Sequence, residues 1–446
     1  MKNKKVFILG MARSGYESAK ILAKNNTVFI TDMKDQDENQ VKELKDLGVK
    51  LVICEDPIEY LDDSYDLLIK NPGIKYTHKT VLKAKELGID VINELELAYY
   101  YMPDDVHIIG ITGSNGKTTT ATLIYKFLKE DERSVYFGGN VGLPLCNFVK
   151  KINSDDFLVL EISDHQLCDM YKFKTNVSVL TNIFPVHIDF HDSFERYKEM
   201  KKRIFNNMTS KDIGIINYDN SEAMNLTRDI KCTKYYFSRK EKKKAYVDDN
   251  AIYYDGNKII DCSEIKMQGV HNYENIMAAI CAVKVYGVSD DSIRNVLKEF
   301  GGVEHRIEYV TTIDGVEYYN DSKSTNCEST KTALNSFKKP TLLILGGLDR
   351  NHSFYDLDDS IDNVTYIACY GETKARIKEY CNEKGISCGV FDNLKEAIIS
   401  CFEKSSDGDV VLLSPACASW DQYKSFEERG NEFKDIVNGL KGNELW

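Results

Sequence analysis

The stretch GITGSNGKTTT, residues 110–120, constrains the fold more than any other part of the chain. It joins the apolar run 105–112 to a helix-like segment that begins KTTTATLIYKF, which is the strand–loop–helix context of a phosphate-binding loop. The usual pattern G-x-x-x-x-G-K-[ST] would begin with a glycine where this chain has Ile111. Gly113 and Gly116 still allow the backbone to approach a phosphate closely, while Ile111 continues the strand. We therefore predict a nucleoside triphosphate site and not a glycine-rich turn with a chance lysine.

Two side chains of this loop have expected roles in such a site. Lys117 supplies a point charge for the β- and γ-phosphates, and the hydroxyl of Thr118 is placed to hold Mg²⁺. Backbone N–H groups at the start of the following helix also favour an anion.

Apolar strand-like runs alternate with helix-like segments along the whole chain, in three blocks. This alternation predicts an α/β protein whose parallel, doubly wound sheets bind ligands at the carboxyl ends of their strands. We expect a Rossmann-like domain over residues 1–96, a central P-loop ATPase-like domain over 97–302, and a Rossmann-like domain over 303–446. The pair Gly301–Gly302 is a candidate hinge.

Composition excludes several classes of protein. A chain of 446 residues with 42% apolar and 29% charged residues fits a globular protein of two or three domains. We expect no membrane span, because no apolar run reaches 18 residues. The start MKNKKVFILGMARSG fits a first strand better than a signal peptide. The net charge of −12 argues against a nucleic-acid-binding surface.

The 12 cysteines are scattered singly, without a C-x-x-C pair. In a chain of this size the pattern predicts reduced, mostly buried thiols in a cytoplasmic protein, and neither disulfides nor a structural zinc site.

Two residues that follow neighbouring strands suggest a metal site beside the loop. Glu161 ends the run FLVLE, and His187 comes a few residues after VSVLTNI. The carboxyl ends of parallel strands meet at one edge of the sheet, so a carboxylate and an imidazole are expected there together. For His187 taken alone, a histidine in a surface loop is the simpler interpretation.

Lys201 is expected to face inward. In SFERYKEMKKRIFNNM, helical spacing places Phe194, Tyr197, Ile204 and Met208 on one stripe, and Lys201 falls in a gap of that stripe. Burial would favour a neutral, nucleophilic amine. The alternative is an ammonium group that reaches past the edge of the core into water.

Polar clusters mark the two outer blocks. Asp32 ends the second strand, where a Rossmann fold places a ribose-binding acid, but the preceding G-x-x-x-x-G favours a nucleotide-binding turn without a nicotinamide half. In the last block, NDSKSTN and LSPACASWDQYKSF follow strands. These clusters suggest a substrate cleft between domains.

Taken together, GITGSNGKTTT, GGNVGLPL, EISDHQL, HNYENIMAA, NDSKSTN and LSPACASWDQYKSFEERG resemble the Mur ligases over essentially the whole chain. Folylpolyglutamate synthases share the loop. The SPACASWDQ segment is similar to that of the members that add D-glutamate. The chain departs from the family pattern at Asp164–His165, where Ser-Phe is common, at Val186, where an acid often precedes the histidine, and at Arg350, where some members have lysine.

The resemblance implies a role for each matching residue. Gly113, Ser114, Asn115, Gly116, Lys117, Thr118, Thr119, Asn275, Arg306 and Asp321 would bind ATP. Thr118, Glu161, His187 and a carbamylated Lys201 would hold two Mg²⁺ ions. Ser14, Asp32, Gly73 and Asn140 would contact the UDP-linked substrate, and Thr325, Arg350, Ser419 and Phe426 would form the D-glutamate pocket. The catalytic residues would be Lys117, His187, Lys201 and Lys323.

The resemblance further implies a cytoplasmic, monomeric ligase that uses ATP to join D-glutamate to UDP-N-acetylmuramoyl-L-alanine through an acyl phosphate. Three alternatives stay open. The chain could be another Mur ligase or a folylpolyglutamate synthase-like ligase, a P-loop NTPase switch, or a protein whose first block is a nicotinamide-binding regulatory domain.

Overall fold

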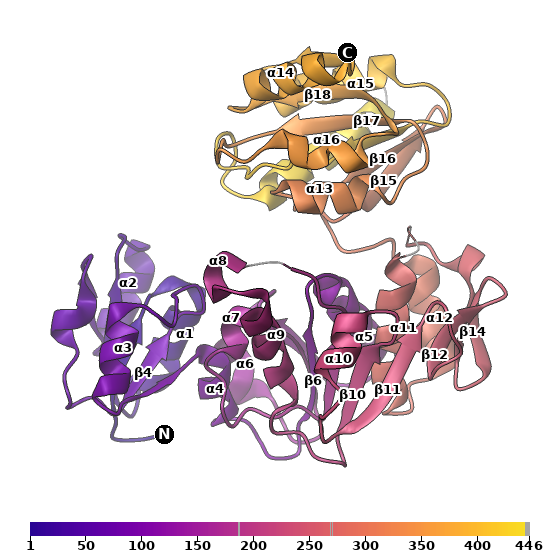
Figure 1. Cartoon of the computed structure of the whole chain (residues 1–446). Coiled ribbons are helices and arrows are strands. Elements are labelled where there is room, and N and C mark those ends of the chain that lie inside the picture. Colours follow the sequence, from indigo (N-terminus) through magenta and orange to yellow (C-terminus); the bar gives the residue numbers. More distant parts are fainter. Residues whose placement is uncertain (186–187, 268, 270, 442–446) are drawn as a thin grey trace. The chain divides into compact units, whose positions relative to one another are not determined.

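The computed structural model describes residues 1–185, 188–267, 269 and 271–441, which fold into three α/β sheets (Figure 1). The chain divides into two compact units, one of residues 1–264 with 271–298, the other of residues 265–270 with 299–446. The first unit holds two sheets and the second holds one. The α/β class with mainly parallel sheets is confirmed, whereas the boundaries at 96/97 and 302/303 stay a prediction.

The N-terminal sheet is fully parallel, with the strand order β3-β2-β1-β4-β5. Its apolar strands are covered on both faces by helices, so that almost every residue of the central strands is buried. Its elements are β1 (Lys5–Leu9), α1 (Ala12–Ala23), β2 (Thr27–Asp32), α2 (Glu38–Asp46), β3 (Lys50–Ile53), β4 (Leu67–Lys70), α3 (Lys79–Glu86), β5 (Asp90–Ile92) and α4 (Glu94–Tyr99).

The central sheet has nine strands in the order β14-β13-β12-β11-β10-β9-β6-β8-β7. Strands β6 to β12 run parallel to one another, and β12, β13 and β14 form an antiparallel meander. The strands are β6 (His107–Thr112), β7 (Val135–Gly139), β8 (Phe157–Glu161), β9 (Val177–Leu180), β10 (Ile213–Asn217), β11 (Thr233–Ser238), β12 (Ala245–Asp248), β13 (Ala251–Tyr254) and β14 (Asn257–Asp261). The helices are α5 (Lys117–Glu130), α6 (Leu145–Phe148), α7 (Asp164–Leu167), α8 (Ile188–His191), α9 (Phe194–Lys202), α10 (Ser221–Leu226), α11 (His271–Lys284) and α12 (Asp290–Glu299).

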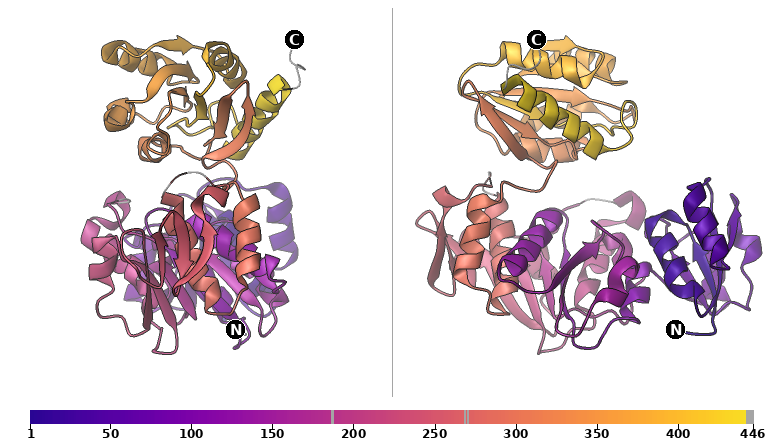
Figure 2. Two further views of the ribbon diagram at one scale, coloured as in Figure 1. Left: turned by 90° about the vertical axis from the view of Figure 1, so that its right-hand side faces the viewer. Right: turned by 180° about the vertical axis from the view of Figure 1, so that it is seen from behind.

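The second unit contains a six-stranded sheet in the order β15-β16-β20-β17-β18-β19, parallel except for the β15–β16 hairpin. Helices lie on both faces of this sheet (Figures 1 and 2), and each face has its own apolar core. Its elements are β15 (Glu308–Ile313), β16 (Val316–Asn320), α13 (Cys327–Leu334), β17 (Thr341–Gly346), β18 (Val364–Tyr370), α14 (Lys374–Lys384), β19 (Cys388–Val390), α15 (Leu394–Lys404), β20 (Val410–Leu413) and α16 (Phe426–Lys441). Within the part of the chain that the structure describes, no helix is both long and apolar enough to span a membrane.

Buried polar contacts fasten the first two sheets to each other. Lys70, at the end of β4, forms a fully buried ion pair with Asp169, with 2.9 Å between Nζ and Oδ2. The carboxylate of Glu96 accepts hydrogen bonds from three successive backbone N–H groups, those of residues 171–173. Because unpaired buried charges are costly, these contacts favour one arrangement of the N-terminal sheet on the central sheet.

A pH dependence of stability follows from Glu94, which is buried at the same junction and accepts a hydrogen bond from the backbone N–H of Cys146. Burial raises the pKa of Glu94 from 4.5 to about 7. The folded state therefore keeps this proton to higher pH than the unfolded state, and its contribution to stability is lost as the pH rises from about 4.5 to about 7.

Glutamine imitates the protonated form of this side chain. Glu94→Gln is therefore expected to gain stability relative to the parent chain over this pH range, by up to about 3 kcal/mol at pH 8. Urea unfolding of both proteins at pH 5, 6.5 and 8 measures the difference, with the exposed Glu86→Gln as control. Parallel stability curves for Glu94→Gln and its parent would contradict the expectation.

Candidate active site

The loop between β6 and α5 has a backbone shape that requires its two glycines. Gly113 has φ +145° and Gly116 has φ +80°, both in the region that favours glycine. A Cβ on Gly113 would lie 1.9 Å from Oγ1 of Thr181, and a Cβ on Gly116 would lie 2.1 Å from Oδ1 of Asn275. The loop is thus packed against the residue that follows β9 and against α11. Asn275, one of the residues expected to contact the nucleotide, lies directly beside the loop.

The remaining loop residues are held by their neighbours. Ser114 shares a hydrogen bond with the hydroxyl of Tyr197 at 2.8 Å, and the backbone N–H of Asn115 donates to Oδ1 of Asn182 at 2.9 Å. The Nζ of Lys117 lies 2.7 Å from the backbone oxygens of both Gly113 and Ser114. The lysine therefore folds back over the loop, which is where a charge must lie to act on a bound phosphate.

Glu161 lies at the carboxyl end of β8, beside the start of α5, as predicted. Its Oε2 accepts a hydrogen bond from the hydroxyl of Thr118 at 2.7 Å, and its Oε1 accepts one from Nδ2 of Asn140 at 2.9 Å. The side chains of Thr118, Thr119 and Glu161 are all buried. The structure thus gathers a carboxylate, a hydroxyl and an amide at one point, although the sequence argument assigned Asn140 to a different ligand.

Lys201 is fully buried, as the apolar stripe predicted. Helix α9 begins after the cap residue Ser193 and ends at Lys202, and a short 3₁₀ turn continues the stripe. The Nζ of Lys201 lies 3.0 Å from Oδ1 of Asp164 and 3.3 Å from Oγ1 of Thr112. Burial lowers the pKa of Lys201, and the Asp164 carboxylate opposes this effect.

Asp164 is the centre of a charged cluster that the sequence did not reveal. Its Oδ2 lies 2.8 Å from Nε2 of His191, which is fully buried, and 3.4 Å from Nδ1 of His165. The cap residue Ser163 forms a capping box with Gln166 and so fixes the start of the helix that carries Asp164. His187, the other predicted metal ligand, lies outside the described residues.

The predicted contacts to the UDP-linked substrate lie at the carboxyl edge of the N-terminal sheet. Asn71, which follows β4, donates to the hydroxyl of Ser14 at 3.2 Å and accepts from the backbone N–H of Gly73 at 3.2 Å. Asp32 accepts from the backbone N–H of Met11 at 2.8 Å. Asn71 therefore organises this edge, and the sequence analysis did not single it out.

In the second unit, a buried arginine joins the two segments that carry the expected amino-acid pocket. Arg429, on α16, is fully buried; its Nε donates to Oγ of Ser322 at 2.9 Å, and its Nη2 donates to the backbone oxygens of Ser322 and Cys417 at 2.8 and 3.1 Å. Beside this joint, Nζ of Lys323 lies 5.6 Å from the ring centre of Phe426. Arg429 lies within the motif LSPACASWDQYKSFEERG, but no role was predicted for it, because EERGNEF is typical of an exposed helix start.

The other predicted pocket residues of this unit, Thr325, Arg350 and Ser419, lie in the loops that follow β16, β17 and β20. Arg350 is exposed, and its guanidinium lies 4.9 Å from the ring centre of Trp420. Ser419 is buried, and its backbone oxygen accepts from the N–H of Tyr423 at 2.8 Å. Thr325 is partly buried in the loop before α13.

The two predicted nucleotide contacts of this unit differ in exposure. Arg306 is exposed, whereas Asp321 is fully buried and accepts from the hydroxyl of Ser414 at 2.7 Å. Burial raises the pKa of Asp321 to about 6. The backbone on either side of Arg306 has positive φ, +62° at His305 and +45° at Ile307. Such strain in a β-branched residue is uncommon and is found most often at functional sites.

Comparison with known proteins agrees with this geometry. The sequence model of the Mur ligase middle domain matches residues 111–283, and that of the Mur ligase glutamate ligase domain matches residues 305–417. The chain is 43% identical to UDP-N-acetylmuramoylalanine–D-glutamate ligase of Geobacillus kaustophilus over 446 residues, covering 99% of this chain and 98% of that protein. It is 41% identical to the enzyme of that name from Bacillus subtilis over 440 residues, covering 97% of each chain.

Solved structures with the same fold are more distant in sequence. UDP-N-acetylmuramate–alanine ligase of Thermotoga maritima superposes with a TM-score of 0.59 at 16% identity, covering 98% of this chain and 100% of that one. MurF ligase of Thermotoga maritima, solved in complex with ADP, superposes with a TM-score of 0.58 at 17% identity, covering 99% and 96%. The fold is thus that of Mur ligases, and with its full-length identity to the curated enzymes the chain belongs to the Mur ligase family, among the UDP-N-acetylmuramoylalanine–D-glutamate ligases.

Proposed function

We propose that this protein uses ATP to join D-glutamate to the alanyl carboxylate of UDP-N-acetylmuramoyl-L-alanine, as a step in peptidoglycan precursor synthesis. The structural observation that supports it best is the convergence of the Lys117 loop, Glu161 and the buried Lys201 at one edge of the central sheet. We further expect it to act as a monomer in the cytoplasm.

Amide formation from a free carboxylate in water is uphill, so the carboxylate must first be activated. In the proposed reaction the alanyl carboxylate oxygen attacks the γ-phosphorus of ATP, ADP leaves, and an acyl phosphate forms. The amine of D-glutamate then attacks the acyl carbon, loses a proton, and displaces inorganic phosphate. Lys117 acts by offsetting negative charge on the transferred phosphoryl group, so catalysis is mainly positioning and electrostatics.

The donor set beside the loop suits Mg²⁺. The hydroxyl of Thr118 and the carboxylate of Glu161 are hard oxygen ligands 2.7 Å apart, the kind that Mg²⁺ prefers. When bound there, the ion would neutralise phosphate charge. The family pattern would add His187 and a carbamylated Lys201 for a second ion.

The Asp164 carboxylate beside Lys201 makes formation of that carbamate less favourable. Carbamylation needs the neutral amine, whereas the Asp164 carboxylate at 3.0 Å favours the ammonium form of Lys201. A carbamate would also place a second negative charge beside Asp164. We therefore propose that Lys201 carries the carbamate only when Mg²⁺ is present to offset both charges.

Within the second unit, the proposed amino-acid pocket combines positively charged side chains, which suit the carboxylates of glutamate, with apolar surface. Arg350 has the planar, bidentate donor geometry that recognises a carboxylate, and Phe426 and Trp420 provide apolar surface. Lys323 lies against Phe426 and supplies a second positive charge for the two carboxylates of glutamate.

Phosphate release tests the proposal. With ATP, Mg²⁺ and UDP-N-acetylmuramoyl-L-alanine, we expect sustained release with D-glutamate and little with L-glutamate, L-lysine or meso-diaminopimelate. Positional isotope exchange in ATP that depends on the UDP-linked substrate would support the acyl phosphate. Release that does not depend on that substrate would contradict the proposal and favour an NTPase switch. Dependence on another amino acid would favour a different Mur ligase.

A further inference from the structure

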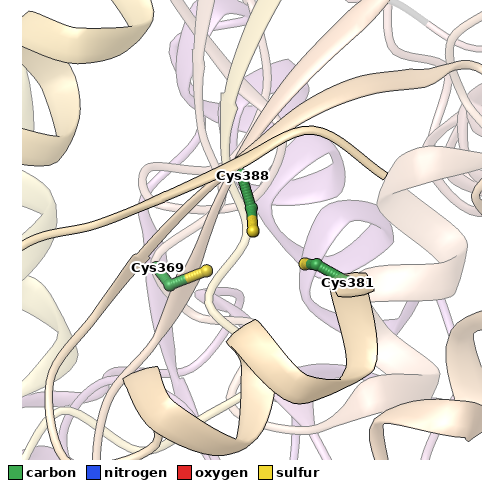
Figure 3. Close-up of side chains that lie close together, drawn as sticks. All are labelled: Cys369, Cys381 and Cys388. Carbon is green, nitrogen blue, oxygen red and sulfur yellow. The ribbon is translucent and has the colours of Figure 1, made fainter. Parts of the chain in front are cut away.

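Three cysteine side chains from three successive elements, 12 and 7 positions apart in the sequence, converge in the second unit. Cys369 lies near the end of β18, Cys381 on α14, and Cys388 at the start of β19. Their sulfur atoms all lie within 4.8 Å of one another, and Figure 3 shows the three side chains pointing toward a common centre. Sequence spacing alone predicted no metal site, because these residues form no C-x-x-C pair.

Burial of cysteine by itself is ordinary in this chain and does not explain the convergence. Most of the twelve cysteines are buried, and all are free. Among the described residues, however, no other group of three or more histidine, cysteine or acidic side chains brings its ligand atoms this close. Cysteines that serve only as small apolar side chains have no reason to direct three sulfurs at one point.

The spacing is close to that of a metal site. In a tetrahedral zinc site each Zn–S bond is about 2.3 Å, which places the sulfurs about 3.8 Å apart. The observed upper limit of 4.8 Å would have to shrink by about 1 Å at most, a change that small rotations of three side chains can supply. Cys388 is only partly buried, so solvent reaches one side of the cluster, from which a water could serve as the fourth ligand.

The surroundings shift the three thiols in different directions. Hydrogen bonding with Cys381 and burial raise the pKa of Cys369, and burial raises the pKa of Cys388. Hydrogen bonding from Cys369 lowers the pKa of the Cys381 thiol, and the nearby Lys378 acts in the lowering direction on all three cysteines. A cation on the helix that carries Cys381 thus partly offsets the negative charge that bound thiolates would have.

We propose that Cys369, Cys381 and Cys388 form a three-thiolate site for a soft divalent cation, with Zn²⁺ as the physiological ligand. Binding replaces the thiol protons, which pass to solvent, and three thiolates with Zn²⁺ carry a net charge of −1 beside Lys378. The ion would join α14 to β18 and to β19, the edge strand of the sheet. It would therefore stabilise this edge of the second unit, apart from the ligase reaction.

Cadmium titration tests the site. The full chain is reduced, treated with EDTA and desalted, and Cd²⁺ is added while the ultraviolet thiolate-to-cadmium absorption is recorded. We expect saturation at about one equivalent, displacement by excess Zn²⁺, and a higher Tm of the metal-bound protein. Cys381→Ala should abolish the absorption.

Cys401→Ala is the matched control, because Cys401 is a free, fully buried cysteine of the same unit that lies outside the cluster. This variant should bind Cd²⁺ like the parent. If Cys381→Ala does not fold, Cys388→Ala replaces it, since that thiol is partly exposed. Absorption unchanged in the cluster variants, or no absorption in the parent, would overturn the proposal.

Discussion

Lys117→Ala is expected to lower the rate of ligation by about 10³-fold or more, with little change in stability. The Nζ of Lys117 lies 2.7 Å from the backbone oxygens of Gly113 and Ser114 in its own loop, and the side chain is only partly buried. We therefore expect the apolar core to tolerate the loss of this side chain, whereas the transferred phosphoryl group would lose the positive charge that offsets its own. Steady-state phosphate release and thermal unfolding of the same preparation measure both quantities.

Lys129→Ala provides the matched control for this variant. It removes an exposed lysine from the last turn of the same helix and should leave the rate near that of the parent. Full activity of Lys117→Ala would show that the loop does not act on a phosphate. A large loss of stability instead would assign the lysine a structural role.

Lys201→Ala is expected to lose both activity and stability. Removing one partner of a buried ion pair costs about 3–5 kcal/mol, because the buried Asp164 carboxylate would lose the cation 3.0 Å from its Oδ1. If a carbamate on Lys201 supports catalysis, the rate should fall by about 100-fold or more and should be partly restored by acetate or formate. Lys201→Arg keeps a positive charge but should stay inactive with either acid, because its guanidinium cannot be carbamylated in this way.

The double variant Lys201→Ala/Asp164→Asn separates the two effects. It should recover part of the lost stability in urea unfolding without recovering the rate. If the single alanine variant keeps its activity without added acid, then Asp164 supplies the carboxylate and the carbamate is not required.

Local patterns were enough to predict the parts of this molecule that depend on neighbours in sequence. The strand–loop–helix context identified the loop around Lys117, and helical spacing placed Lys201 in the core. The antiparallel meander of β12 to β14 was not anticipated, although Asp255–Gly256 between β13 and β14 is a strong hairpin signal. Both residues of that turn have positive φ, as such turns require.

Contacts between distant segments were beyond the sequence argument for a physical reason. Asp164 and Lys201 are 37 positions apart, and only the packing of α7 against α9 turns them into an ion pair. Arg429 reaches a partner 107 positions away, and its helix position gave no sign that it would be buried. The three cysteines likewise converge only because α14 lies along β18 and β19. Single-sequence periodicity reports which face of an element is apolar, not which polar residue it will meet.

The hydrogen bonds of Arg429 to Ser322 and Cys417 also determine which parts of the protein can form first during synthesis on the ribosome. The chain emerges from its N-terminus, so the central sheet and its nucleotide loop are complete long before residue 429 is made. The backbone oxygens of Ser322 and Cys417 receive their hydrogen bonds from the Arg429 guanidinium only after that residue has been made. A nascent or truncated chain that lacks α16 would therefore retain the groups proposed to handle ATP while its amino-acid pocket is still unformed. In such a chain, an activated carboxylate would have water as its only available acceptor.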